Sequence, residues 1–250
     1  MYKFDAKDAM NKCVEWVRNW FEENGKGCNA VIGISGGKDS SVAAGICVAA
    51  LGKERVFGVL MPQGDQFDIN YSYEICEFLG IDYVVVNIKD AVDGVLKNIP
   101  ESIKITDQAK FNLPPRIRMS TIYAVSQCKN GRVVNTCNLS EDWVGYSTRY
   151  GDSVGDFSPL SNFTVTEVIS IGRELGIPAK FIEKTPIDGL CGKTDEDNLG
   201  FTYKMLDQYI REGIEPPKEI KEKIDILHKN NLFKLKLMDS FKYESNEGEE

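Results

Sequence analysis

The sequence predicts an α/β fold in which helices cover both faces of an open parallel sheet, giving three layers. Short runs rich in valine and isoleucine alternate with segments of helical periodicity, and polar or glycine residues follow each run. Strands that alternate with helices in this way form a parallel sheet. The predicted strands are residues 31–34, 55–61, 82–86 and 132–135.

Helices are predicted where apolar residues recur at helical spacing and a stop signal follows. The first covers residues 5–24 and ends at Asn24-Gly25, the second follows Lys38, and a third runs from about Pro114 to Lys129 and ends at Asn130-Gly131. Three more helical segments lie at 164–176, 194–210 and 216–231. We expect these three to cover the sheet, with residues 1–243 forming one domain before an acidic, disordered tail at 244–250.

Composition excludes several classes of function. The 250 residues include 42% hydrophobic ones, enough for a sizeable core, and 30 basic against 38 acidic residues give a net charge of -8, which argues against a broad grip on nucleic acid. No signal-like amino terminus or run of eighteen apolar residues occurs, so we expect a cytoplasmic protein with no membrane partner. Seven cysteines without a Cys-x-x-Cys pair argue against a disulfide framework or a zinc site.

The turn after the first strand, "GISGGKDS" from Gly33 to Ser40, has the character of a phosphate site. A turn from a strand into a helix directs backbone N–H groups and the positive end of the helix dipole at one point. Gly36 and Gly37 allow the main chain to approach a phosphate and to adopt positive φ, and nearby serine hydroxyls add donors. A carboxylate at Asp39 beside a phosphate is reasonable if Mg²⁺ lies between them.

Other phosphate-loop patterns fit this turn poorly. In a Walker A loop, serine or threonine would follow Gly37-Lys38, where this chain has Asp39, and a glycine would precede Gly37 by five residues. The Gly-x-Gly-x-x-Gly pattern of dinucleotide-binding folds is also absent from the turn. An ordinary tight turn leaves the fixed register of serine, aspartate and serine unexplained.

The turn resembles the loop of the ATP pyrophosphatase superfamily, whose members cut ATP between the α and β phosphates. Three later segments are similar to successive motifs of the ammonia-dependent NAD synthetase family: "NLPPRIRM" from Asn112, "NTCNLSEDWVGYSTRYGDSVGDFSPL" from Asn135 and "GKTDEDNLGFTY" from Gly192. This resemblance implies a Rossmann-like, adenine nucleotide alpha hydrolase-like fold. It also implies a homodimer.

The resemblance assigns site residues in three groups. It places ATP at Gly33, Ile34, Ser35, Gly36, Gly37, Lys38, Asp39, Ser40, Thr136 and Lys184, Mg²⁺ at Asp39 and Glu141, and deamido-NAD at Arg116, Tyr146, Arg149, Asp156, Phe233 and Lys234. We expect Asp152 or Asp156 to bind ammonium and take its proton, so the catalytic residues are Asp39, Glu141 and Asp152. His228, the only histidine, is read as part of an amphipathic helix and left out of the site.

The implied reaction is the ATP-dependent amidation of deamido-NAD by ammonia. The nicotinate carboxylate would attack the α-phosphorus, and ammonia would displace AMP from the adenylate to give NAD. Ammonia would be free or supplied by a separate protein. Val165 and Ile187 replace polar residues that contact ATP in the family, so we expect weaker ATP binding or compensation by Lys38, Lys184 or Lys193.

Two other functions stay open. One is another adenylating amidotransferase, such as a GMP-synthetase-like enzyme, which would need xanthylate as acceptor. The other is a non-catalytic nucleotide-binding module, in which Val165 and Ile187 mark a decayed site. A tRNA thiolation enzyme is disfavoured because catalytic cysteine pairs and a basic surface are missing.

Overall fold

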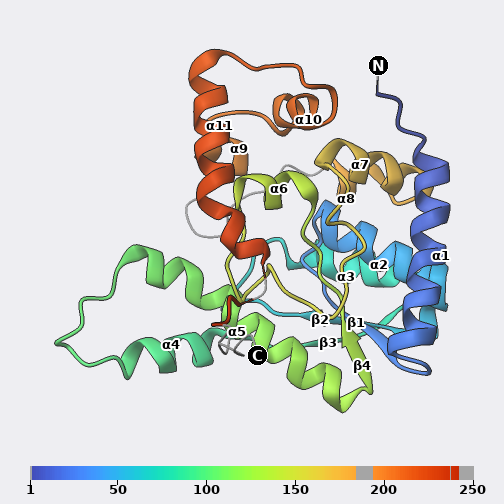
Figure 1. Cartoon of the computed structure of the whole chain (residues 1–250). Helices are drawn as coiled ribbons and strands as arrows, with labels where there is room; N and C mark the ends of the chain where they lie inside the picture. The colour runs from blue at the N-terminus through green and yellow to red at the C-terminus, as the bar shows by residue number, and fades with distance from the viewer. Residues whose placement is uncertain (1, 184–193, 237, 242–250) are drawn as a thin grey trace, which may run out of the picture.

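A four-stranded parallel sheet organises the chain, as predicted (Figure 1). The computed structural model describes residues 2–183, 194–236 and 238–241. The strands are β1 (Asn29–Gly33), β2 (Val56–Leu60), β3 (Asp82–Val85) and β4 (Gly131–Val133), and they lie in the order β3-β2-β1-β4. The reversal of strand order between β2 and β4, on either side of β1, opens a crevice at the carboxyl ends of the strands.

Helices lie on both faces of this sheet. The first part of the chain contributes α1 (Ala6–Asn24), α2 (Lys38–Leu51), η1 (Lys53–Arg55), α3 (Ile69–Leu79), α4 (Lys89–Lys97) and α5 (Asp107–Cys128). The second part contributes α6 (Leu139–Val144), α7 (Val165–Glu174), α8 (Ala179–Ile182), α9 (Asp195–Leu199), α10 (Tyr203–Glu212), α11 (Lys218–Asn231) and η2 (Leu232–Leu235). One layer is formed by α1, α2, α3 and α7, whereas α5 packs against β1 and β4 from the other face.

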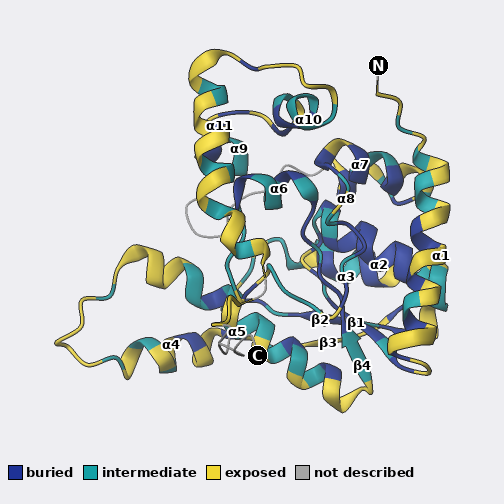
Figure 2. Cartoon of the chain, in the orientation of Figure 1, coloured by how far each residue is buried: buried dark blue, intermediate teal, exposed yellow. Residues whose placement is uncertain are grey.

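Alternation along the strands divides the core between these two layers. Ile32 packs with the α2 side, and its neighbour Val31 packs with Ile122 of α5. Successive side chains of a strand point to opposite faces, so a strand buried on both faces is apolar throughout. Helix α2 is buried along most of its length (Figure 2), because α1, α7 and the sheet surround it.

Helix α5 begins earlier than predicted. It starts at Asp107, where the side chain of Thr106 accepts a hydrogen bond from the N–H of Ala109, and Pro114 and Pro115 lie inside it. The prolines suggested a helix start because proline suits the first turn. The actual start is set by the threonine cap, Thr106, eight residues before Pro114.

Two further segments differ from the prediction. The segment between β4 and α7 contains a short helix that was not predicted, α6, whose capping box joins Asn138 and Glu141. The helix expected over 194–210 is two helices, α9 and α10, because Gly200 ends α9 with a φ of 76°. By contrast, α7 begins at the predicted capping box of Thr164 and Glu167.

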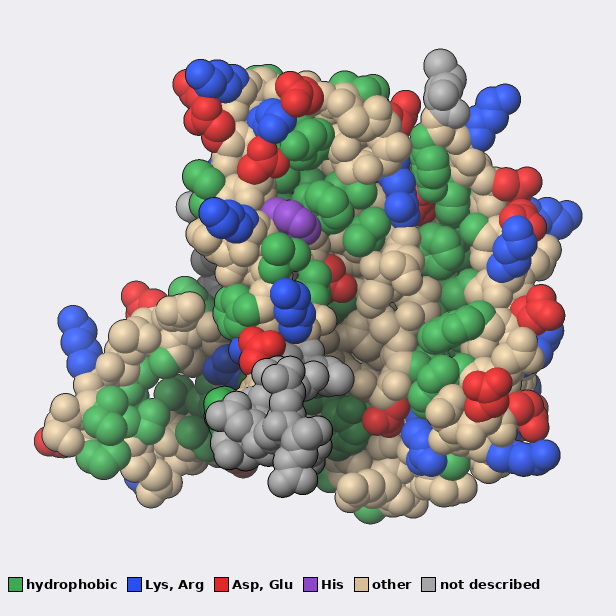
Figure 3. Space-filling view, viewed as in Figure 1, with side chains coloured by type: hydrophobic (Ala, Val, Ile, Leu, Met, Phe, Trp, Pro, Cys, Tyr) green, Lys and Arg blue, Asp and Glu red, His purple; other side chains and the backbone are tan. Residues whose placement is uncertain are grey.

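The sequence predicts that all the carboxyl-terminal helices cover the sheet, and this prediction is wrong for two of them. Helix α7 packs on α1 and α2, but α10 and α11 pack on α6 and α7 around a second apolar cluster that includes Leu206 and Ile224. This cluster stands beside the carboxyl ends of the strands (Figure 1). On the face shown in Figure 3, acidic and basic side chains are interspersed. Within the described segments, no helix has the length and apolar character needed to span a membrane.

Candidate active site

The two glycines of the turn between β1 and α2 have different structural reasons. Gly36 has a φ of 73°, and a Cβ atom there would lie 2.7 Å from Cβ of Tyr71 and 2.8 Å from the backbone nitrogen of Ser72. Gly37 has an extended backbone with a φ of -91°, and a Cβ there would meet only Ser35 Oγ, at 3.4 Å. Positive φ therefore applies to Gly36 alone, where α3 also presses on the turn, and Gly37 is the glycine whose missing side chain leaves open space.

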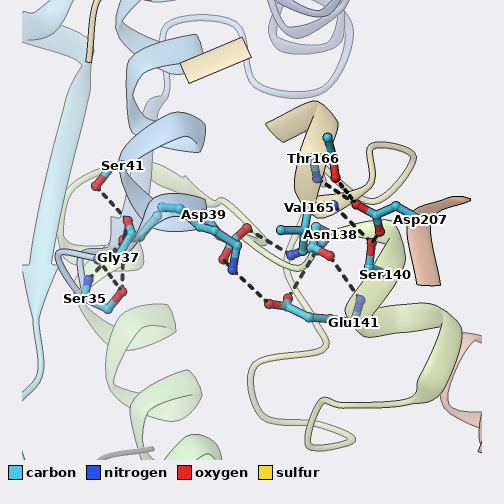
Figure 4. A network of polar contacts seen from close by, with 12 residues as sticks. Ser35, Gly37, Asp39, Ser41, Asn138, Ser140, Glu141, Val165, Thr166 and Asp207 are labelled. Carbon is cyan, nitrogen blue, oxygen red and sulfur yellow. Dashed lines mark hydrogen bonds and ion pairs between the residues drawn. The ribbon is translucent and has the colours of Figure 1, made fainter. Parts of the chain in front are cut away.

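Serine hydroxyl groups hold the turn in shape (Figure 4). Ser41 Oγ donates to the carbonyl oxygen of Gly37 at 2.7 Å, and Ser35 Oγ lies 3.0 Å from Ser40 Oγ. No side chain caps the amino terminus of α2 at Gly37. The positive end of this helix is therefore left to a ligand.

The turn lines a cavity of about 730 Å³ at the carboxyl ends of the strands. The predicted ATP and catalytic residues on its wall are Gly33, Ile34, Ser35, Gly37, Lys38, Asp39, Ser40, Thr136, Glu141 and Asp152. Gly36 is not on the wall, and Lys184 and Ile187 lie outside the described residues. Residues from 61 to 69, which follow β2, form much of another side. The cavity therefore lies at the carboxyl ends of β1, β2 and β4, where the strand order reverses and open α/β sheets bind ligands.

A buried lysine separates the two predicted metal ligands. Lys38 Nζ lies 2.9 Å from Asp39 Oδ2 and 3.7 Å from Glu141 Oε1, and Asn138 donates its side-chain N–H to Asp39 Oδ1 at 3.0 Å (Figure 4). Burial acts to lower the pKa of Lys38, but the two carboxylates outweigh it and raise this pKa above its ordinary value. Burial, reinforced by the charge of Asp39, raises the pKa of Glu141 well above the usual range. The pair is thus an enclosed acidic site that one cation neutralises in part.

The donor set fits Mg²⁺. In the described part of the chain, no three acidic, cysteine or histidine side chains are arranged to hold a metal ion by themselves. Mg²⁺ at a phosphate site needs only one or two carboxylates, because phosphate oxygens and waters complete its shell. Asp39 and Glu141 both line the cavity and both reach one ammonium group, so together they can serve one cation.

A second network fixes the helix that carries Glu141. Ser140 Oγ donates to Asp207 Oδ1 at 2.5 Å and accepts from the N–H of Val165 at 3.0 Å, while Thr166 donates to Asp207 from its N–H and its hydroxyl (Figure 4). The carboxylate of α10 thus joins α6 to the start of α7. Val165, which replaces a polar residue of the family, has its side chain buried in the second apolar cluster.

Most residues predicted for deamido-NAD gather outside this cavity. The guanidinium of Arg149 stacks over the ring of Phe233 at 5.0 Å, and its backbone oxygen accepts from Arg116 Nε at 3.2 Å. Lys234 Nζ donates to the carbonyl oxygens of Gly145 and Ser147. The fold therefore brings Arg116 of α5 and Phe233 and Lys234 of η2 against the loop after α6, but they do not line the cavity wall. Tyr146 lies on the same loop, half-buried against the second apolar cluster.

The structure separates the two candidates for ammonium. Asp156 caps the edge of the sheet, because its carboxylate accepts from the N–H of Val133 at 2.7 Å and from Tyr123 Oη at 3.2 Å. Asp152 lines the cavity and is open to it, yet the surrounding protein raises its pKa, although hydrogen bonds from Thr148 act in the opposite direction. Asp152 is therefore the available acid. His228 stacks on Trp143 and bonds to its carbonyl oxygen, which places it in the packing of α11 on α6.

Several features of the site could not be read from the sequence. Arg118 and Asp195 line the cavity, and elsewhere three buried hydroxyl groups, those of Ser147, Ser153 and Tyr203, have no hydrogen-bond partner among the described residues. The helix at Glu141 did have a signal, since Asn138 stands three residues before it in capping-box spacing. Arg118 had none beyond its place two residues after Arg116.

An open parallel sheet, an uncapped helix behind a glycine turn, and paired carboxylates at the same edge define a nucleotide-binding α/β protein. Residues 9–245 match the family model for NAD synthase, and the chain belongs to this family. The resemblance seen in the motifs is confirmed.

The relatives and solved structures agree. The chain is 42% identical to the NH(3)-dependent NAD(+) synthetase of Methanococcus aeolicus over 86% of this chain and 85% of the relative, and 40% identical to that of Thermococcus sibiricus over 84% and 82%. The structure of NMN synthetase from Francisella tularensis has a TM-score of 0.89 at 30% identity, covering 96% of this chain and 100% of that one. An NH3-dependent NAD synthetase from Campylobacter jejuni has a TM-score of 0.78 at 26% identity, with the same coverages.

Proposed function

We propose that the protein is an ammonia-dependent NAD synthetase, a ligase that amidates deamido-NAD with the release of AMP and pyrophosphate. The observation that carries this proposal is the match of nearly the whole chain to the NAD synthase family, together with a phosphate turn and a carboxylate pair on one cavity. A carboxylate is unreactive towards ammonia at neutral pH, and its adenylate is not. The use of ATP follows from this difference.

The chain's own residues would act by positioning and neutralising anions. The open backbone at Gly37 and the amino terminus of α2 would hold the pyrophosphate that leaves ATP. Asp152, exposed to the cavity, would bind ammonium and accept its proton before the nitrogen attacks. No protein nucleophile is needed, because the acyl carbon is activated by the nucleotide.

Asp39 and Glu141 would hold Mg²⁺, which neutralises phosphate charge when bound. Six carboxylates line the described wall, those of Asp39, Asp65, Asp68, Glu141, Asp152 and Asp195, against the two cations Lys38 and Arg118. A triphosphate alone would be repelled by such a wall. The excess of acids thus supports a divalent cation as companion to ATP.

The test is to incubate the purified protein with ATP, Mg²⁺, ammonium and deamido-NAD, omit each in turn, and measure NAD and AMP. NAD should form only in the complete mixture, and Asp39→Ala and Glu141→Ala should abolish it while the circular dichroism spectrum is retained. Release of AMP with xanthylate instead would favour a GMP-synthetase-like enzyme. ATP binding without AMP release from any acceptor would indicate a non-catalytic module.

A second candidate acceptor is nicotinic acid mononucleotide, because the structure described as NMN synthetase superposes with the TM-score of 0.89 given above. Both reactions amidate the same nicotinate carboxylate. The ratio of kcat/KM for the two acceptors decides between them. A ratio above about tenfold corresponds to about 1.4 kcal/mol of preferential transition-state binding.

We also propose a cytoplasmic homodimer that takes ammonia free or from a separate protein, with the first 243 residues acting as one domain. In support of a dimer, the connection between α4 and α5 and the first turns of α5 project from the molecule (Figure 1), and exposed apolar side chains there include Ile103 and, within α5, Phe111. Light scattering after size exclusion would give the mass, and a monomer at micromolar concentration would contradict the dimer.

A further inference from the structure

We propose that the guanidinium of Arg118 binds an oxyanion of a substrate, a carboxylate or a phosphate, from the face of the sheet opposite to α2. This inference rests on the proposed function and adds a specificity-determining residue to it. The cavity brings together Arg118 of α5 and the phosphate turn of α2, which lie on different sides of the sheet.

Arg118 is anchored at one end only. Its Nε donates to the carbonyl oxygen of Met61, just beyond the end of β2, at 3.0 Å. This bond fixes the plane of the guanidinium at the cavity wall. Its two Nη groups form no hydrogen bond to any residue in the described part of the chain, so four N–H donors remain for a ligand.

The two cations of the described cavity wall are not equivalent. Lys38 is already neutralised, since both Asp39 and Glu141 lie within 4.0 Å of its Nζ. No carboxylate oxygen of residues 2–183, 194–236 or 238–241 lies that close to Arg118. Arg118 is therefore the cation on this wall that an incoming anion can pair with directly.

The surroundings make a ligand role more reasonable than a solvated one. Arg118 is half-buried, and burial lowers its pKa, partly opposed by the charge of Asp152. Guanidinium stays protonated at all physiological pH values, so a half-buried fork without an ion pair is costly. Planar forks bind carboxylate and phosphate groups through two parallel hydrogen bonds, which would offset that cost.

Arg116 shows the contrast. It lies two residues earlier on the same helix, so its side chain leaves α5 on roughly the opposite side. It is exposed, donates to the backbone oxygen of Arg149, and is not on the cavity wall. One motif thus sends one arginine to the predicted dinucleotide cluster and the other into the cavity.

The experiment measures dissociation constants by calorimetry for the full-length protein and for Arg118→Gln. Glutamine can still donate to the carbonyl of Met61 but carries no charge. The probes are deamido-NAD, NAD and a non-hydrolysable ATP analogue with Mg²⁺. The matched control is Arg132→Gln, because Arg132 also donates Nε to a backbone oxygen at 3.0 Å, that of Asn24, far from the carboxyl ends of the strands.

Arg118→Gln should weaken one class of ligand by about ten- to a hundredfold, the range for a charged hydrogen bond. Loss for deamido-NAD but not for NAD identifies the nicotinate carboxylate as the oxyanion. Equal loss for both dinucleotides identifies their phosphates, and loss for the ATP analogue identifies its phosphates. Arg132→Gln should bind all three like the unmodified protein.

The proposal is overturned if a folded Arg118→Gln binds all three probes within about twofold of the unmodified protein. If that variant does not fold, Arg118→Lys takes its place, since it keeps the charge and loses the fork; it should bind the affected probe less tightly, and unchanged binding by this folded variant overturns the proposal. Failure of the unmodified protein to make NAD would contradict the proposed amidation, and the dissociation constants would still decide the role of Arg118.

Discussion

Gly36→Ala and Gly37→Ala should have different effects, the first on the stability of the fold and the second on the affinity for ATP. At Gly36 the new methyl group would meet the backbone of α3 at 2.8 Å, closer than real Cβ atoms approach. The position also has a φ of 73°, which side chains other than glycine rarely adopt. We therefore expect Gly36→Ala to act on stability first.

The magnitude follows from these two effects. A left-handed backbone costs an L-residue about 1–2 kcal/mol. Forcing extra volume into a packed site costs about 1–3 kcal/mol more. The free energy of unfolding should thus fall by about 2–5 kcal/mol, and the midpoint of thermal unfolding by roughly 4–20 °C for a chain of this size.

Gly37→Ala is the matched partner. Its φ of -91° suits alanine, and the nearest atom to the new Cβ, Ser35 Oγ at 3.4 Å, is at ordinary contact distance. Stability should change by less than about 1 kcal/mol. Because Gly37 lines the cavity, the methyl group would stand where a phosphate approaches, and we expect ATP affinity to fall by more than about tenfold.

Urea unfolding and calorimetric ATP titration on both variants separate the two effects. The reasoning is refuted if Gly36→Ala unfolds at the same urea concentration as the unmodified protein. It is equally refuted if Gly37→Ala retains full ATP affinity, because the open backbone would then not be the phosphate contact.

Two further perturbations test the supports of the site. Asp207→Ala leaves the buried hydroxyl of Ser140 without its acceptor, so the free energy of unfolding, measured in urea, should fall by about 1–3 kcal/mol. The value of kcat, measured by steady-state kinetics, should also fall because α6 and Glu141 shift. An unchanged kcat would show that this network does not support catalysis. For Glu167, burial acts to raise the pKa, but hydrogen bonds from Arg211 and Tyr2 outweigh it and lower this pKa below the ordinary 4.5. A lowered carboxyl pKa stabilises the fold above pH 4.5, and the effect disappears as the pH falls through the folded-state pKa, so Glu167→Gln should flatten the acid limb of stability against pH; a profile identical to that of the unmodified protein would contradict the assignment.

The sheet could be predicted because its signals are local. Each strand is a short apolar run followed by polar or glycine residues. The residues of the turn at Gly36-Gly37 are by themselves enough to predict a phosphate site. The start of α5 was missed because Pro114-Pro115 resembles a helix start, whereas the threonine cap, Thr106, lies eight residues before Pro114. Local patterns compete in such cases, and the tertiary structure selects one of them.

The site was predictable only in part, because its remaining contacts join distant segments. That Asp39 and Glu141 meet follows from their places after neighbouring parallel strands. That Lys38 lies between them does not, since the sequence does not specify the rotamer of a long side chain. The choice between Asp152 and Asp156 likewise depended on which carboxylate the edge of β4 uses for hydrogen bonds.

The charges of the cavity give its two sides different tasks. On the α2 side, Lys38 is paired with two carboxylates, so this side offers an anion backbone N–H donors and, under the proposed function, a metal ion, more than a free positive charge. On the α5 side, Arg118 offers charge and a planar fork but no backbone cradle. When a carboxylate attacks a phosphate, two anions must come into contact. A site that neutralises one anion from the α2 side and the other from the α5 side lowers the repulsion between them. Neither side of the cavity then attracts both anions.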